Sequence, residues 1–180
     1  MNALNSENTV CIVVDIQERL TPALNEAEAM VASSRLLLQG LQALAVPLLV
    51  TEQYPKGLGV TVAAVKLLLG DALLFEKTRF SAFTDEVAAA LKTQGAQNVI
   101  LVGAEAHVCM LQTALDLRAA GYAVYVPFEC TTSRAAANKA NALAQMSAAG
   151  VVVSNVESVL FQLLADAKHP AFKTVSKLIQ

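Results

Sequence analysis

Short apolar runs alternate along the chain with longer segments in which apolar residues recur at helical spacing. This alternation predicts βαβ units, in which helices connect parallel strands. Because the runs are rich in Val, Ile and Leu, we expect helices to cover both faces of the sheet. The predicted strands are residues 10–15, 47–51, 72–76, 98–103, 123–127 and 151–154.

Helical periodicity is clearest in residues 28–44, 84–95 and 133–150, and the last two segments end at a glycine that suits a helix C-terminus. Neither a Pro/Ser-rich linker nor an internal repeat divides the chain, and its 180 residues can bury a sizeable core. We therefore predict a single α/β domain over residues 1–180, with a doubly wound parallel sheet between two helical layers.

The composition is more apolar than that of most monomeric proteins. Apolar residues make up 55% of the chain, charged residues 16%, and the mean hydropathy is +0.49. We attribute the excess to buried strands and to a subunit interface, so we expect a homo-oligomer, a dimer or larger. The most apolar stretch, residues 36–50, contains two glutamines, a glycine and a proline and is too short to cross a bilayer. No membrane partner is expected.

Other features of the sequence bear on compartment and partners. The first ten residues lack the basic region and long apolar core of a signal peptide, and the three cysteines show no disulfide spacing. Both features predict a cytoplasmic protein. A net charge of −2 gives no reason to expect a nucleic-acid partner. Neither GxGxxG nor GxxxxGK[ST] follows a predicted strand, which argues against nucleotide chemistry.

Three reactive side chains stand at the ends of three predicted strands. Asp15 and Lys77 end or directly follow two of the apolar runs, and Cys109 lies in the turn between the run 98–103 and the next helical segment. Parallel strands end at one edge of a sheet, so these side chains could converge. A thiol at a helix N-terminus feels the positive end of the helix dipole, which predicts a stabilised thiolate. Asp15 could accept the thiol proton, and Lys77 could counter the negative charge.

The chain has only two histidines, His107 and His169. His107 precedes Cys109 by two residues on the same tight turn, which is poor geometry for a hydrogen bond between the two side chains. A protease-like Cys/His arrangement is therefore not expected. The base that serves Cys109 is instead predicted to be Asp15.

Three segments resemble the signature segments of the isochorismatase-like cysteine hydrolases: VVDIQ (13–17), FEKTRFSAF (75–83) and GAEAHVCMLQTALDL (103–117). The segment TEQYPKGLG (51–59) is similar to the metal-free, uncharacterised branch of that family. The resemblance implies an Asp/Lys/Cys triad of Asp15, Lys77 and Cys109, a six-stranded sheet of order 3-2-1-4-5-6, and assembly into dimers or larger oligomers.

The resemblance also implies a non-proline cis peptide upstream of the nucleophile, here between Glu105 and Ala106. We expect this bond to turn one backbone N–H toward the oxyanion, with the N–H of Cys109 as the second donor. Nicotinamidases of the family use an Asp and two histidines to bind a metal ion. The segment 51–59 has no histidine, so no metal and no cofactor are expected.

Cys109 favours acyl chemistry, in which the thiol attacks a small amide-like or carbamoyl-like substrate and water hydrolyses the thioester. The alternatives are an oligomeric interaction or regulatory protein that makes little use of the triad, a vinyl-ether hydrolase of the isochorismate type, and a peroxide-sensing thiol. Cys11 and Cys130 are both expected to be inert thiols, Cys11 in the core and Cys130 near the site. The predicted pocket walls are Gln17, Glu52, Tyr54, Phe80 and His107.

Overall fold

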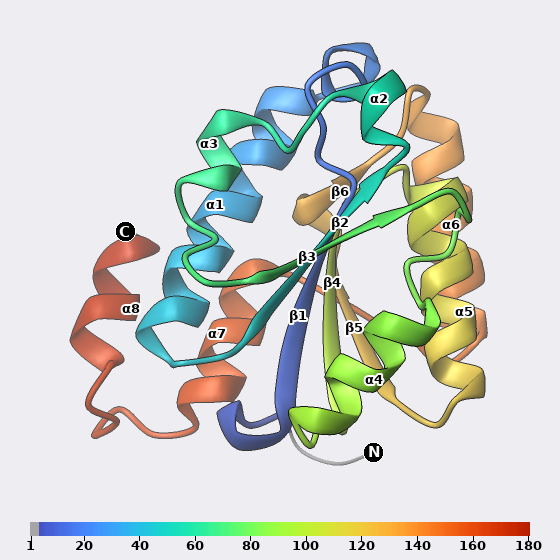
Figure 1. Ribbon diagram of the computed structural model, residues 1–180. Coiled ribbons are helices and arrows are strands. Elements are labelled where there is room, and N and C mark those ends of the chain that lie inside the picture. Colours follow the sequence, from blue (N-terminus) through green and yellow to red (C-terminus); the bar gives the residue numbers. More distant parts are fainter. Residues whose placement is uncertain (1–3) are drawn as a thin grey trace.

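The computed structural model of the protein describes residues 4–180 and shows a central sheet between two layers of helices (Figure 1). Neighbouring strands are parallel throughout, in the order β3-β2-β1-β4-β5-β7, which confirms the predicted order of the six apolar runs. One further strand, β6, pairs with the carboxyl end of β4. The strands are β1 (Thr9–Val14), β2 (Leu48–Gln53), β3 (Leu73–Lys77), β4 (Asn98–Ala104), β5 (Ala123–Pro127), β6 (Thr131–Thr132) and β7 (Val152–Ser154).

Helices cover both faces of the sheet, as the composition of the strands predicts. Residues of α1, α3, α7 and α8 belong to one apolar cluster, and residues of α4, α5 and α6 to a second; the two groups lie left and right of the sheet in Figure 1. The first group is α1 (Ala27–Ala43), α3 (Ala63–Lys66), α7 (Val156–Leu164) and α8 (Phe172–Leu178), and the second is α4 (Asp85–Thr93), α5 (Leu111–Ala119) and α6 (Ala136–Ala148).

The central strand β1 is buried along its whole length and serves both clusters. Successive side chains of a strand point to opposite faces, so Ile12 and Val14 enter one cluster while Cys11 and Val13 enter the other. Cys11 is therefore a core residue, as predicted. On the same face, Gly40 of α1 lets α7 approach closely, because a Cβ atom there would lie 2.5 Å from the Leu160 side chain.

The observed helices α1, α4 and α6 confirm the three helical segments predicted from periodicity. The segment 52–59 includes the end of β2 and the short helix α2 (Pro55–Leu58). Pro55 occupies the first turn of α2, where its fixed φ suits a helix and its missing N–H is not needed. Among residues 4–180, no helix is both long and apolar enough to cross a membrane.

Candidate active site

Asp15, Lys77 and Cys109 meet at the carboxyl edge of the sheet. Asp15 directly follows β1, Lys77 is the last residue of β3, and Cys109 lies in a single π-helical turn, η3 (Ala106–Met110), that leads into α5. The Lys77 Nζ atom lies 2.6 Å from Asp15 Oδ2. The Cys109 thiol hydrogen-bonds to the same carboxylate. All three residues are buried, so solvent screens their interactions little.

Asp15 is held in place by the neighbouring strand β2. Its backbone N–H donates to the Thr51 carbonyl oxygen at 3.1 Å, and the Thr51 hydroxyl donates to Asp15 Oδ1 at 2.8 Å. Burial raises the pKa of the Asp15 carboxyl above its ordinary value, although Lys77 and the hydrogen bonds from Thr51 and Cys109 act in the opposite direction. A carboxylate with a raised pKa is a stronger base.

Lys77 reaches Asp15 across the end of β2, which lies between β3 and β1. Besides Asp15, its ammonium group donates to Gln53 Oε1 at 2.8 Å and to the carbonyl oxygens of Phe80 and Arg79 at 3.1 and 3.2 Å. Four acceptors therefore surround three ammonium protons, and the charge stays fixed next to Asp15. Gln53 and Thr51 are not among the site residues predicted from the sequence.

Cys109 differs from the expectation of a stabilised thiolate. Burial, followed by the negative charge of Asp15, raises the pKa of its thiol to about 12, whereas Lys77 and a hydrogen bond from the Glu105 N–H act in the opposite direction. The prediction of a stabilised thiolate is therefore wrong, because desolvation and the adjacent carboxylate outweigh the favourable groups. At neutral pH the sulfur keeps its proton and donates it in a hydrogen bond to Asp15.

The turn that contains Cys109 is fixed from both of its ends. In β4, Gly103 has a φ of +130°, and a Cβ atom there would lie 1.9 Å from the Val14 carbonyl oxygen, so only glycine fits where β4 passes β1. In α5, the Thr113 hydroxyl donates to the Cys109 carbonyl oxygen at 2.6 Å and accepts from the Ala82 N–H at 2.7 Å. Thr113 thus links the Cys109 turn to the segment that follows Lys77.

A non-proline cis peptide is present, but it joins Ala104 to Glu105. The expected position, Glu105 to Ala106, is wrong by one residue, because the cis bond comes at the last residue of β4 and not inside the turn. The Glu105 N–H is the group that reaches the Cys109 sulfur. The Glu105 carboxylate accepts from the backbone N–H and the Nε of Arg134 at 3.0 and 3.1 Å.

Two of the predicted pocket walls have their side chains in the interior. Gln17 Nε2 donates to the carbonyl oxygens of Gln53 and Gly59 at 3.0 and 2.6 Å. Glu52 Oε1 accepts from the backbone N–H and the hydroxyl of Thr61 at 2.6 and 2.8 Å. The two side chains hold segment 53–61 in place.

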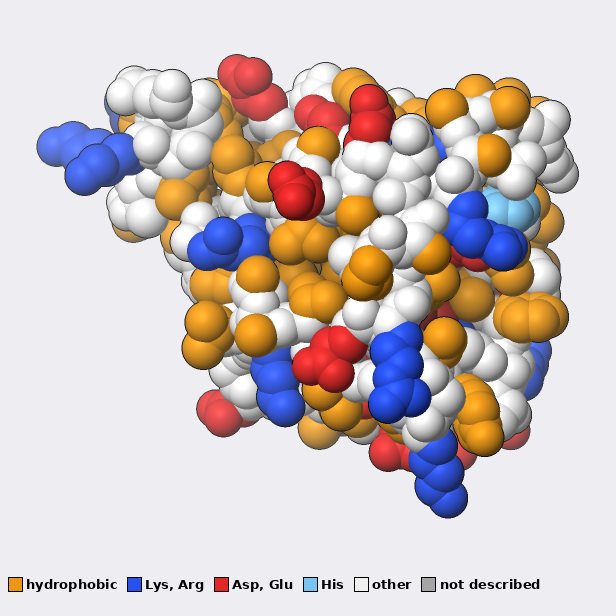
Figure 2. All heavy atoms as spheres, turned by 90° about the horizontal axis from the view of Figure 1, so that it is seen from above, with side chains coloured by type: hydrophobic (Ala, Val, Ile, Leu, Met, Phe, Trp, Pro, Cys, Tyr) orange, Lys and Arg blue, Asp and Glu red, His pale blue; other side chains and the backbone are white. Residues whose placement is uncertain are grey.

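The other predicted walls lie closer to solvent. The Tyr54 and Phe80 side chains are 56% and 54% exposed. His107 Nδ1 lies 3.0 Å from the Ser133 hydroxyl, so this ring connects the Cys109 turn to the segment before α6. Figure 2 shows this end of the molecule from above, where hydrophobic side chains lie among acidic and basic ones.

Two further sequence expectations concern thiols and metals. Cys130 is fully buried, belongs to the same apolar cluster as Cys11, and hydrogen-bonds to Ser34, while burial raises the pKa of its thiol. It therefore lies in the core, not in the site. Within residues 4–180, no group of three or more His, Cys, Asp and Glu side chains is arranged to hold a metal ion.

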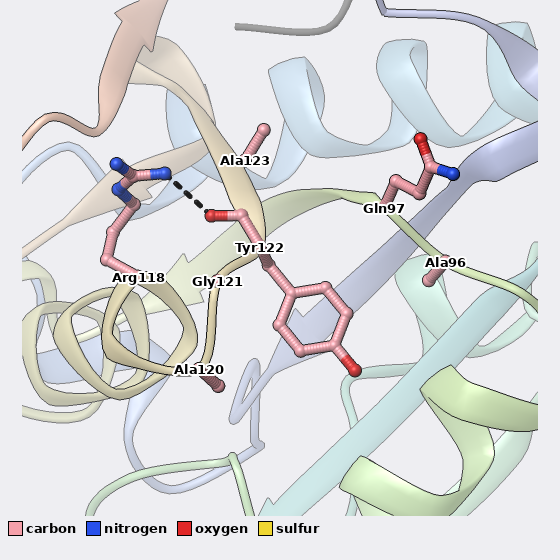
Figure 3. A pocket seen from close by; sticks show the side chains of 7 residues that line it. All are labelled: Ala96, Gln97, Arg118, Ala120, Gly121, Tyr122 and Ala123. Atoms are coloured by element: carbon pink, nitrogen blue, oxygen red, sulfur yellow. Dashed lines mark hydrogen bonds between the residues drawn. The ribbon is translucent and has the colours of Figure 1, made fainter.

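A separate pocket lies at the opposite, amino edge of the sheet (Figure 3). It has a volume of about 620 Å³ and is lined by residues 96–97, 118 and 120–123. Arg118 Nη1 donates to the Tyr122 carbonyl oxygen at 2.8 Å, and the Tyr122 ring points away from this guanidinium group. Asp15, Lys77 and Cys109 are not among the lining residues.

Comparison with known proteins places this geometry in a family. A family model described as the isochorismatase domain matches residues 9–158. Isochorismatase domain-containing protein 1 of Salmo salar is 42% identical over 96% of this chain, which spans only 61% of that relative. Isochorismatase domain-containing protein 2 of Danio rerio is 38% identical, and the match covers 98% of this chain and 89% of the relative.

A solved structure is also similar over nearly the whole chain. The MAR1 ribonuclease of Caenorhabditis elegans superposes with a TM-score of 0.95 and 38% sequence identity, covering 99% of this chain and 92% of that one. The sequence match and the shared fold lead to the same conclusion. The chain belongs to the isochorismatase family.

Proposed function

We propose that the protein is a hydrolase in which Cys109 attacks the carbonyl carbon of a small amide-like or carbamoyl-like substrate. One observation carries the proposal: the Cys109 thiol hydrogen-bonds to Asp15, whose carboxylate is fixed by Lys77 at 2.6 Å. Nucleophilic catalysis needs a base within reach of the nucleophile and a third group that orients the base. The three side chains meet both requirements without a metal or another cofactor.

In the first half of the reaction, the thiol proton passes to Asp15 while the sulfur bonds to the carbonyl carbon. The C–N bond then breaks, and the Asp15 carboxyl gives its proton to the departing amine or ammonia. A thioester remains on Cys109. In the second half, Asp15 takes a proton from water as the hydroxyl bonds to the carbonyl carbon, and the C–S bond breaks as the proton returns to sulfur.

The raised pKa values suit this proton shuttle. Because the Cys109 thiol is protonated at rest, with a pKa of about 12, attack requires that Asp15 remove the proton at the same time. Because burial also raises the pKa of Asp15, the carboxylate is a better proton acceptor than an exposed one. Lys77 stays positive beside the developing negative charge.

Backbone N–H groups of the Cys109 turn are the proposed oxyanion donors. Those of Val108 and Met110 already donate to the Glu105 carbonyl oxygen at 3.0 and 3.2 Å. We therefore assign the oxyanion to the N–H of Cys109 and to the backbone around Glu105 and Ala106. The exposed rings of Tyr54 and Phe80, together with His107, are the proposed walls around the substrate, and Gln17 and Glu52 support the walls from behind.

Intact-mass spectrometry with a set of small amides and carbamoyl compounds tests the proposal. The native protein should gain the acyl mass on Cys109 and release ammonia or an amine, and Cys109→Ala should do neither. A native protein that forms no acyl adduct with any member of the set would count against the hydrolase.

Alkylation by iodoacetamide across a pH range then separates the roles of Asp15 and Lys77. Removing the carboxylate in Asp15→Asn should lower the pH at which Cys109 reacts, whereas Lys77→Met should raise it, because the two charges act on the thiol in opposite directions. Both variants should lose turnover. Identical pH profiles in all three proteins would show that the side chains do not work as a unit.

Three alternatives predict different results. An interaction or regulatory protein forms no acyl adduct but keeps its oligomeric state in Cys109→Ala. A vinyl-ether hydrolase keeps its activity in Cys109→Ala, because no thioester is needed. The name of the Caenorhabditis elegans relative raises ribonuclease activity as a third alternative, although a net charge of −2 offers phosphate little attraction. Cleavage of an RNA substrate that Cys109→Ala abolishes would support it.

Assembly and compartment complete the proposal. Leu73 and Leu74 are exposed on the edge strand β3, and Leu67 is exposed at the end of α3, which supports a homo-oligomer. Light scattering coupled to size-exclusion chromatography measures the oligomer size. The cytoplasmic location predicted from the cysteine pattern is tested by fractionation of the cells that produce the protein.

A further inference from the structure

The Lys77 ammonium group has one side-chain partner besides Asp15. Gln53 Oε1 accepts from Lys77 Nζ at 2.8 Å, and the remaining acceptors are the backbone carbonyls of Arg79 and Phe80. The pairing of β2 with β3 explains this contact, because Gln53 and Lys77 are direct neighbours in the parallel register. Their side chains therefore leave the sheet on the same face.

The Gln53 side chain can take only one orientation in this network. Its Nε2 group donates to the Thr78 carbonyl oxygen at 2.8 Å, so its oxygen must face the ammonium group. Its backbone is held by Gln17, whose side chain accepts from the Gln53 N–H at 2.7 Å and donates to the Gln53 carbonyl oxygen at 3.0 Å. A carboxylate at this position could not donate to Thr78.

Gln53 is also electrically neutral, and this matters for Cys109. Asp15 and Lys77 form a pair of opposite charges, and a second carboxylate beside Lys77 would leave a net negative charge near the thiol. The other charged group in contact with the nucleophile's turn is Glu105, which Arg134 pairs at 3.1 Å. His107 faces Ser133, and Arg79 pairs with Asp116 at 3.8 Å on the surface of α5.

We propose that Gln53 is a positioning residue for the triad: as a neutral acceptor it holds the Lys77 ammonium group on Asp15 and links it to the segment 78–80. The inference rests on the proposed function but concerns a residue outside the triad. Gln53 touches no reacting atom, and it acts through Lys77. Its loss should therefore change how readily Cys109 ionises, and it should lower kcat more than it changes KM.

The test compares Gln53→Glu and Gln53→Met with the native protein, using the pH dependence of Cys109 alkylation by iodoacetamide. Gln53→Glu adds a negative charge at the ammonium group and should raise the alkylation midpoint by about one pH unit. Gln53→Met removes the acceptor without adding charge and should raise the midpoint by less. With an amide substrate identified, both variants should lose about tenfold or more in kcat, with KM little changed.

The matched control is Gln162→Glu, which makes the same chemical change on the exposed surface of α7. Its midpoint should equal that of the native protein. Thermal unfolding of each variant shows whether it is folded, and a purely structural role for Gln53 would lower Tm without moving the midpoint. Midpoints in both Gln53 variants that match the control would overturn the inference. Because alkylation needs no substrate, this result is independent of the amide screen that tests the proposed function.

Discussion

The two edges of the parallel sheet use their polar groups differently. At the carboxyl edge, Asp15 and Lys77 are buried, lie 2.6 Å apart and contact Cys109. At the amino edge, a pocket of about 620 Å³ contains Arg118 and Tyr122, but no Cys, His, Asp or Glu lines it. The reactive groups gather at the carboxyl edge, where a smaller pocket of about 360 Å³ is lined by Lys77 and Tyr54. Strand ends bring these charges together out of water, at the edge where the sites of such sheets generally lie.

The largest expected effect tests this difference between the two edges directly. Cys109→Ala removes the proposed nucleophile and should reduce amide turnover by about 10⁴-fold or more. Arg118→Ala alters the amino-edge pocket and should leave turnover unchanged. Ammonia release by equal amounts of the two folded variants measures the contrast. A large loss of turnover in Arg118→Ala but not in Cys109→Ala would show that the active site lies at the amino edge.

Glycine-to-alanine substitutions compare how much room the backbone leaves for a Cβ atom at each edge. In Gly103→Ala, the added Cβ would lie 1.9 Å from the Val14 carbonyl oxygen, and this overlap cannot be relieved by a side-chain rotation. We expect a loss of more than about 4 kcal/mol in the free energy of unfolding, or failure to fold. Gly121→Ala at the amino edge has a φ of +93° but nothing within 4 Å. Its cost should be about 1–2 kcal/mol in urea unfolding.

Lys77→Met should also lower the free energy of unfolding substantially, although by less than Gly103→Ala. It leaves the Asp15 carboxylate buried without its counter-charge, which typically costs about 3–5 kcal/mol. Arg79→Met is the matched control, because the Arg79–Asp116 pair at 3.8 Å is largely exposed and should contribute less than about 1 kcal/mol. The double variant Asp15→Asn/Lys77→Met should be more stable than Lys77→Met alone. Urea unfolding that gives equal values for Lys77→Met and Arg79→Met would contradict the burial argument.

Much of the architecture could be predicted from the sequence, because apolar runs alternate with segments of helical period and two of the runs end at or just before a charged residue. Asp15, Lys77 and the turn before Cys109 stand out for this reason, and a parallel sheet then brings strand ends to one edge. Gln53 and Thr51 could not be found in the same way. They are uncharged polar residues at the end of β2, and only the pairing of β2 with β1 and β3 shows what they contact.

The degree to which each site side chain is buried could not be predicted from the sequence either. The position of Cys109 before a helix suggests a stabilised thiolate, whereas its pKa of about 12 reflects desolvation and the charge of Asp15. Glu52 illustrates the same limit. Neighbouring residues of a strand point to opposite faces, so Glu52 turns away from Gln53 and bonds to Thr61 in the interior.

The smallest expected effect is the change in the free energy of unfolding at alkaline pH. It reports on the protonated Cys109 thiol at the carboxyl edge. The Cys109 pKa is about 12 in the folded protein against 9.0 for an ordinary thiol. Between these values the unfolded chain has released the proton while the folded protein still holds it, so stability falls as pH rises. Cys11 and Cys130 are also raised and contribute in the same direction. In Cys109→Ala, the fall in unfolding free energy should be smaller by about 1.4 kcal/mol per pH unit, measured by urea titration in reductant at pH values from about 9 to 11. Equal slopes in the native protein and in Cys109→Ala would mean that Asp15 and the surrounding apolar residues do not keep this thiol protonated. The carboxyl edge would then differ from the amino edge in its buried charges, but it would not raise the pKa of the Cys109 thiol.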